Sequence, residues 1–309
     1  MKRIRRVLAV VLALAIAFSI NIPLQSQAKT KYYWEYETNK HYFILDGKWF
    51  QDYEFNQKFD KNGLPKYQTS ISYLKDYEND KISRYEEKTV FKYDKKENMI
   101  QSKYYDDGVL SSYTKYTYDS NGLCTKEKVY DANKKLVSTT TYKRDSHENL
   151  TKQTTKYTDK KKATVTIKIS NTYKKGKLVK YVSASSDGYT CTCTFYSNGN
   201  DKKYVYEGDG YKSTTNYDKY GRETKYVSED EYFNLVETYK YKNKKDRNPS
   251  EIKRTHTIKE SNDVTVENIK RTYESKKDKN GNLLEWIVYE NGEPYSKEEY
   301  SGYKKFKAN

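Results

Sequence analysis

Residues that usually build catalytic and metal sites are scarce in this chain. Only three cysteines and three histidines occur among its 309 residues. None of His41, His147 and His256 stands at metal-ligand spacing from another histidine or from a cysteine. The sequence also lacks a glycine-rich phosphate loop and a Ser/His/Asp arrangement. We therefore predict no catalytic residue, no metal site and no cofactor, and we interpret the three histidines as surface residues.

The cysteines do not suggest a disulfide framework, because an odd number leaves one thiol over. Cys191 and Cys193 alternate along one predicted strand and share a face with Tyr189 and Phe195, so a direct bond between them would strain that strand. We interpret both as small buried residues. A disulfide from Cys124 to one of them is the alternative, and the redox state of all three stays open.

Aliphatic residues are few, and that scarcity combined with 33% charged residues is typical of disorder. The 36 tyrosines reverse the expectation, because each ring buries a large apolar area while its hydroxyl reaches water or a partner. The chain has only four prolines, and no linker rich in Pro or Gly divides it into halves. We expect one folded array with a thin core.

Long apolar runs are absent except near the N-terminus. Four basic residues at positions 2–6 precede an uncharged apolar run at 7–20, and Ser26-Gln27-Ala28 places small residues where a signal peptidase reads them. The run is shorter than the roughly 20 residues that a membrane helix needs, although a membrane anchor is the alternative interpretation. We predict a signal peptide at 1–28, a secreted or extracellular mature protein, and no membrane span in it.

One turn motif is abundant: an aromatic residue, Asp, two further residues, Gly or Asn, then usually an apolar residue. Copies begin at Phe59, Tyr118 and Tyr217, and a related copy begins at Asp278. Successive turn aspartates are 12 to 14 residues apart, which is one strand plus one turn; they are Asp94, Asp106, Asp119, Asp131, Asp145 and Asp159. Between them apolar and polar residues alternate, as at Val165, Ile167 and Ile169. We predict an all-β, extended antiparallel β-hairpin repeat array, as a meander or a spiralling sheet. The sequence leaves open whether the sheet is open or closed, and the oligomeric state.

The motif has a physical explanation as a hairpin turn. Asp bonds to the backbone two residues on, and Gly or Asn tolerates left-handed geometry. We expect Gly122 at positive φ, with Asn98 and Asn149 in the equivalent slot of their own copies. A calcium loop is the competing interpretation, but the glutamate that such a loop needs downstream is missing.

The two ends of the array differ from its middle. Residues 29–60 contain Trp34, Trp49 and a candidate hairpin at 45–50, and we expect them to form an N-terminal aromatic capping segment. Residues 61–309 form the hairpin array. Its last strand region, 283–289, is apolar on both faces, as a C-terminal cap would be.

The motifs at Tyr116–Gly122 and Tyr217–Arg222 resemble the YD repeat of bacterial Rhs proteins and teneurins, and the related antitoxin-type hairpin repeats. The resemblance covers most of residues 60–295. Several copies depart from the pattern: 94–98 lacks Gly, 173–178 lacks Asp, and the Arg usual after Gly occurs only at Arg222. The resemblance implies spiralling β-sheets used for contact at the cell surface. At this length the chain is not expected to enclose a cargo.

The surface is basic and rich in tyrosine. The formal net charge is +16, and it is +12 without the first 28 residues, which hold four basic and no acidic side chains. Lysine and tyrosine interleave at two places, which we predict as binding candidates: Lys202, Lys203, Tyr204, Tyr206, Tyr239, Tyr241, Lys244 and Lys245. Tyrosine rings suit sugars by stacking, and lysines suit anionic polymers by charge. The alternative is purely structural, with tyrosine as core and lysine preventing edge-to-edge aggregation.

Two classes of function therefore remain open. The first is a secreted non-catalytic binding module at the bacterial cell surface, directed at an anionic envelope polymer, a glycan or a protein; no nucleic acid is expected. The second is a secreted polysaccharide-active enzyme with an unrecognised Tyr/Lys site, which would need a cleft with convergent groups of perturbed pKa. Choline- or glucan-binding wall repeats, suggested by Gly47-Lys48-Trp49-Phe50, need an aromatic motif in every repeat, and the chain has only three tryptophans.

Overall fold

The computed structural model describes residues 32–45, 47–76, 81–261 and 263–307. The predicted signal peptide at 1–28 lies outside these residues. The described part consists of strands and turns, with 22 strands in chain order. They are β1 (Tyr32–Glu35), β2 (Thr38–Leu45), β3 (Lys48–Phe59), β4 (Pro65–Asp76), β5 (Lys81–Tyr93), β6 (Met99–Asp106), β7 (Val109–Tyr118), β8 (Cys124–Asp131), β9 (Leu136–Arg144), β10 (Leu150–Tyr157), β11 (Val165–Lys174), β12 (Lys177–Ser185), β13 (Thr190–Phe195), β14 (Asp201–Gly208), β15 (Tyr211–Tyr217), β16 (Glu223–Glu229), β17 (Phe233–Lys240), β18 (Glu251–Ile258), β19 (Asp263–Lys277), β20 (Leu283–Glu290), β21 (Glu293–Ser301) and β22 (Lys304–Lys307).

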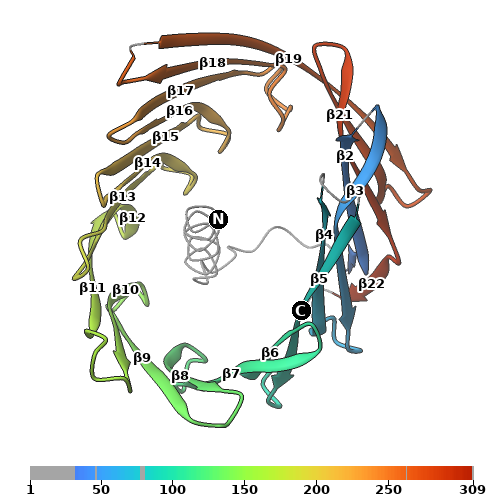
Figure 1. Ribbon diagram of the computed structural model, residues 1–309. Helices are drawn as coiled ribbons and strands as arrows, with labels where there is room; N and C mark the ends of the chain where they lie inside the picture. Colours follow the sequence, from blue (N-terminus) through green and yellow to red (C-terminus); the bar gives the residue numbers. More distant parts are fainter. Residues whose placement is uncertain (1–31, 46, 77–80, 262, 308–309) are drawn as a thin grey trace.

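Strands β2 to β21 form one antiparallel meander that closes into a 20-stranded barrel (Figure 1). The closing pair joins β2 to β21, with Thr38 opposite Ser301 and Phe43 opposite Ser296. The all-β hairpin architecture predicted from the repeats is confirmed, but the array is closed rather than extended. Closure has a physical advantage, because it removes the two unpaired edges that an open sheet would expose.

The described residues of the segment at 29–60 include two strands of the barrel wall. It contains β1, β2 and β3, and β2 pairs with both β3 and β21. Its candidate hairpin is present, with Gly47 at φ +72°. The C-terminal region at 283–289 lies within β20, between β19 and β21. Strands β1 and β22 pair only with each other, as a short ribbon beside the barrel.

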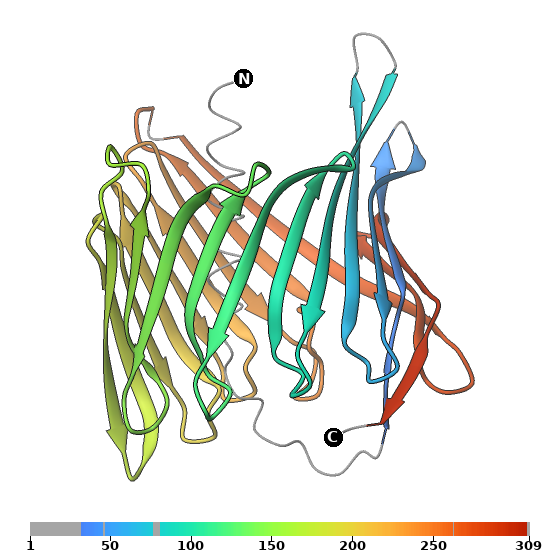
Figure 2. The ribbon, with the colours of Figure 1, turned by 90° about the horizontal axis from the view of Figure 1, so that it is seen from below.

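The two ends of the barrel carry different turns. Each turn from an odd-numbered to the following even-numbered strand lies at one end, which we call the aspartate rim (Figure 2, lower edge). Six of these turns share one geometry: the aspartate Oδ1 accepts the amide of the fourth residue after it, and in all six the aspartate amide donates to that residue's carbonyl. These aspartates are Asp60, Asp94, Asp119, Asp145, Asp218 and Asp278. The recurring aspartate of the sequence is therefore a turn residue.

The left-handed position in each of these turns is the third residue after the aspartate. Gly122 has φ +80° there, as predicted, and Gly221 has φ +78°. The expectation that Asn98 and Asn149 fill this slot is wrong. Glu97 (φ +67°) and Glu148 (φ +66°) occupy it, and each asparagine follows one residue later.

Gly122→Val is expected to lower the free energy of unfolding by about 1 kcal/mol or more, because a β-branched residue resists positive φ. Gly122→Asn should cost less, since short polar side chains tolerate this region. The nearest atom to an added Cβ is Asn98 Oδ1 at 3.5 Å, so the difference reports backbone strain and not a clash. Urea unfolding of the two variants measures it, and equal losses would contradict a left-handed requirement.

Tyrosine hydroxyls tie several turns of the aspartate rim to their neighbours. Tyr118 donates to the carbonyl of Met99 at 2.7 Å, and Tyr241 donates to that of Glu223 at 2.8 Å. Tyr303 makes the same bond to Leu283. In all three cases the acceptor is the fifth residue after the aspartate of the neighbouring turn. A tyrosine at this rim therefore joins one hairpin to the next in these three places, and at Tyr118 it is the tyrosine of the repeat motif.

The two faces of the sheet differ in composition. Most rings of β6 to β18 lie on one face, here the tyrosine face, where paired residues include Tyr181 with Cys193 and Tyr204 with Thr215. The opposite face carries mainly Lys and Thr, and we call it the lysine face. The core is thin, as composition predicts: the buried apolar residues among those described are Ile71, Leu150, Cys193, Ile252, Ile269 and Phe306.

Candidate functional site

A continuous set of lysines covers the lysine face from β6 to β12. Directly paired residues of an antiparallel sheet point to the same face, so strand register places side chains reliably. Lys115 is opposite Lys128, and Lys152 is opposite both Lys143 and Lys168. Four further lysines are assigned to this face because each is directly opposite a residue that lies on it. The pairs are Lys103 with Tyr113, Lys126 with Thr117, Lys156 with Thr139, and Lys180 with Thr172. We call this set the lysine field: Lys103, Lys115, Lys126, Lys128, Lys143, Lys152, Lys156, Lys168 and Lys180.

No carboxylate neutralises the lysine field. The acidic residues of β6 to β12 are Asp106, Glu127 and Asp131, and all three pair with residues of the tyrosine face. Burial raises the pKa of Glu127 on that opposite face. Among the described residues, none of the nine lysines of the lysine field takes part in an ion pair.

Elsewhere in the barrel, several lysines and arginines are paired with carboxylates. Lys276 Nζ lies 2.6 Å from Glu285 Oε1, Arg254 Nε lies 2.7 Å from Glu237 Oε1, and Lys297 Nζ lies 2.7 Å from Glu299 Oε1. These strands carry carboxylates beside their basic residues, whereas the lysine face of β6 to β12 carries none. Like charges directly opposite each other destabilise a sheet, so folding alone does not explain this arrangement.

The first predicted candidate group is divided between the two faces. Lys203 is opposite Asn216 on the lysine face, whereas Tyr204 is opposite Cys193 and Tyr206 is opposite Cys191 on the tyrosine face. Lys202 lies at a register shift of β14, with its Nζ 5.8 Å from the centroid of the Tyr196 ring. The interleaving of Lys and Tyr in sequence therefore does not form one mixed surface here.

Tyr206 of this group belongs to a row of three tyrosine rings. Tyr206 lies between Tyr189 (ring centroids 5.8 Å apart) and Tyr211 (6.1 Å). Burial raises the pKa of Tyr206 to about 12. The Tyr189 ring lies over Gly208, where an added Cβ would stand 2.3 Å from Tyr189 Cδ1, and its hydroxyl donates to Asp209 Oδ2 at 2.7 Å. The row is well packed within itself.

The second candidate group lies at the aspartate rim around Arg222. Tyr241 stacks against Arg222, whose guanidinium carbon is 4.2 Å from the ring centroid, while the Tyr239 hydroxyl donates to Glu237 at 2.7 Å. Burial raises the pKa of both tyrosines. Lys244 and Lys245 are exposed in the loop between β17 and β18, which lies on the inner side of the ring of strands in Figure 1.

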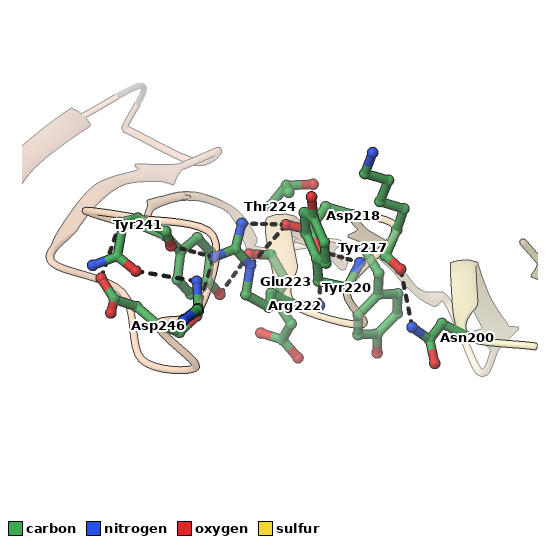
Figure 3. Close-up of polar contacts among 12 residues, drawn as sticks. Asn200, Tyr217, Asp218, Tyr220, Arg222, Glu223, Thr224, Tyr241 and Asp246 are labelled. Atoms are coloured by element: carbon green, nitrogen blue, oxygen red, sulfur yellow. Dashed lines mark hydrogen bonds and ion pairs between the residues drawn. The ribbon is translucent and has the colours of Figure 1, made fainter. Parts of the chain in front are cut away.

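Arg222 holds this loop to the adjacent turn (Figure 3). Its Nε donates to Asp218 Oδ2 at 2.8 Å, and its Nη1 donates to the carbonyls of Asn243 (2.8 Å) and Asp246 (3.0 Å). Burial acts to raise the pKa of Asp218, but the bonds from Arg222 outweigh it and hold that pKa below its ordinary value. The only arginine that matches the repeat pattern is therefore a structural clamp.

The cysteines and histidines are accounted for by packing. Cys124, Cys191 and Cys193 are free thiols, and Cys193 is 2% exposed. Burial raises the pKa of the Cys193 thiol to about 12. His41 bonds to Asp52 at 2.7 Å, His147 stacks on Tyr173 and His256 stacks on Phe233. The described residues contain no group of three or more His, Cys, Asp or Glu placed to hold a metal ion.

One shallow hollow combines carboxylates with lysines. It has a volume of about 370 Å³ and is lined by residues of β2, β19, β20 and β21 that include Lys40, Glu285 and Glu299. Burial acts to raise the pKa of Glu299, but hydrogen bonds from Lys297 and Tyr42 hold it below its ordinary value. This carboxylate is therefore an ion-pair partner of Lys297.

Comparison with known proteins finds matches among solved structures, each at low sequence identity and a TM-score below 0.5. No protein-family model and no curated protein matches the sequence. Among solved structures, the crystal structure of TcdB2–TccC3 matches 84% of this chain at 12% identity and a TM-score of 0.30, and this chain corresponds to 18% of that one. A porin-like protein from Bacteroides uniformis matches 86% of this chain and 97% of its own, at 10% identity and a TM-score of 0.35. A porin-like protein from Bacteroides vulgatus matches 75% and 96%, at 12% identity and a TM-score of 0.28. Within the described residues, no helix has the length and apolar character to cross a membrane.

Proposed function

We propose that this chain is a secreted, non-catalytic binding module that holds an anionic polymer of the cell envelope on its lysine field. The observation that carries the proposal is the register of β7 to β11, which sets Lys115 against Lys128 and Lys152 against both Lys143 and Lys168 with no carboxylate on that face. An anion bridging these ammonium groups would remove the repulsion that the free protein bears.

A linear polymer fits this surface better than a small anion. The lysines are spread over seven strands instead of converging on a pocket, and most are well exposed. A repeating charge can follow such a row, releasing counterions at each contact, and the affinity then falls as salt rises. Secretion, wall association by charge, and kinship to YD-repeat proteins are parts of this proposal that rest on the sequence.

Neutralising the lysine field should separate binding from stability. A variant with Lys115, Lys128, Lys143 and Lys152 each replaced by Gln should bind inorganic polyphosphate and purified cell walls about tenfold or more weakly, with a shallower salt dependence. Its free energy of unfolding should rise, by roughly 0.2–1 kcal/mol for each opposed pair removed. Binding is measured by fluorescence titration and pulldown across a salt series, and stability by urea unfolding.

The matched control removes the same charge elsewhere. Lys202, Lys203, Lys244 and Lys245 replaced by Gln give the same net charge and test the candidates predicted from sequence. Equal losses in both variants would show that only net charge matters, and unchanged binding in both would refute the lysine field. Retention on walls stripped of anionic polymer, unaffected by salt, would point to a glycan or a protein partner instead.

A further inference from the structure

Exposed apolar side chains are concentrated at one end of the barrel. Each turn from an even-numbered to the following odd-numbered barrel strand lies at the end opposite the aspartate rim (Figure 2, upper edge). Of the thirteen large hydrophobic residues exposed in the described chain, eleven lie in these turns or within a few residues of them: Leu74, Ile82, Tyr85, Val109, Val137, Tyr232, Phe233, Ile258, Val264, Val266 and Tyr295. We call this end the apolar rim.

The exposure at the apolar rim is substantial. Val109 is 70% exposed, Ile82 and Val264 are each 59% exposed, and Leu74 is 57% exposed. The β4–β5 hairpin that carries Leu74 and Ile82 projects beyond its neighbours in Figure 2. Hydrophobic residues scattered singly over a surface need no explanation, but the concentration of eleven out of thirteen at one end of a barrel marks a contact surface.

Charge indicates what that surface meets. Over β12 to β17 the turns of the apolar rim are acidic, with Asp187, Asp209, Asp230 and Glu231. The opposite rim is basic over the same part of the wall, where the loop at 241–250 carries Lys242, Lys244, Lys245 and Arg247. The other two exposed hydrophobic residues, Tyr220 and Leu284, lie at this basic end.

We propose that a second copy of this chain docks end to end, with its aspartate rim against the apolar rim of the first. The two ends belong to one 20-stranded ring, so their circumferences match in strand number. Basic loop then faces acidic turns, and Tyr220 and Leu284 meet a ring of apolar side chains. The contact joins unlike surfaces, so each added copy presents the same free end and the assembly grows as a stack.

Sedimentation velocity of the purified protein over a concentration series tests the stacking. The wild type should form species larger than the monomer. An apolar-rim variant, Val109→Asp with Val264→Asp, and a basic-rim variant, Lys244→Glu with Lys245→Glu, should each stay monomeric. A mixture of the two should form a 1:1 complex and nothing larger, because each supplies the end that the other lacks. A control variant, Thr141→Asp with Ser170→Asp, places the same charge at exposed positions within strands β9 and β11. This control should still stack.

Three results would overturn the proposal. The first is a wild type that is monomeric throughout the series, and the second is a mixture that forms no complex. The third is self-association of the basic-rim variant alone, which would mean that two apolar rims meet each other. Flotation with phosphatidylcholine vesicles distinguishes a further occupant: a monomeric wild type that floats, while the apolar-rim variant does not, would assign this rim to a lipid surface.

Discussion

Arg222→Ala is expected to lower the free energy of unfolding by roughly 2–3 kcal/mol and to free the loop at 241–250. The Arg222 side chain is 13% exposed and that of Asp218 is 22% exposed. Removing one partner of a buried ion pair costs 3–5 kcal/mol, so a pair with some access to solvent should cost somewhat less. The carbonyls of Asn243 and Asp246 would also lose their donor. Urea unfolding measures the first effect, and amide hydrogen exchange across the loop measures the second.

Two companion variants make the result specific. Arg222→Lys keeps the charge but cannot bond Asp218 and both carbonyls at once, so it should fall between wild type and alanine. Lys219→Ala removes one positive charge from the same turn and should change stability by less than about 0.5 kcal/mol. If Arg222→Ala and Lys219→Ala had equal effects, the clamp would not exist.

Gly208→Ala should destabilise the protein by about 1–2 kcal/mol, because its new Cβ would stand 2.3 Å from Tyr189 Cδ1. The ring cannot turn away freely, since its hydroxyl is bonded to Asp209. Thermal or urea unfolding of the single variant measures this cost.

In a Tyr189→Ala background, the expected effect of Gly208→Ala on stability changes sign. With Tyr189→Ala the obstructing ring is gone, and Gly208→Ala should become neutral or stabilising, because glycine in a strand costs conformational entropy. This double-mutant cycle isolates the contact. A cost that persists without the ring would mean that the strand backbone itself requires glycine.

The repeats predicted the local structure because turn chemistry is local. Asp119 and Gly122 determine their own hairpin through bonds that span only a few residues. One local prediction was wrong. Asn98 was expected at the left-handed position, but that position is the third residue after Asp94, which is Glu97. Closure could not be read in the same way, since it depends on twist and tilt accumulated over 20 strands.

The lysine field was invisible in sequence because the face of a residue depends on strand register and bulges. Lys202, Lys203 and Tyr204 look like one patch, yet Lys203 and Tyr204 point to opposite faces. Lys115 and Lys128 look unrelated, yet they are directly opposed. Alternating lysines, such as Lys126 and Lys128, were the available signal, and only strand pairing shows that successive strands add to one face.

The single seam between β2 and β21 sets an order on folding. Every other pairing within the barrel joins strands that are consecutive in the chain, so hairpins can form and add to one another locally. The seam instead brings Thr38 to Ser301, across nearly the whole chain. The entropy cost of closing it is lowest once the intervening strands are in place. A partly synthesised chain therefore carries the open edge of β2 until its last strands are available. The risk of edge-to-edge aggregation during folding therefore depends more on the time spent in that open state than on the strength of any one hairpin.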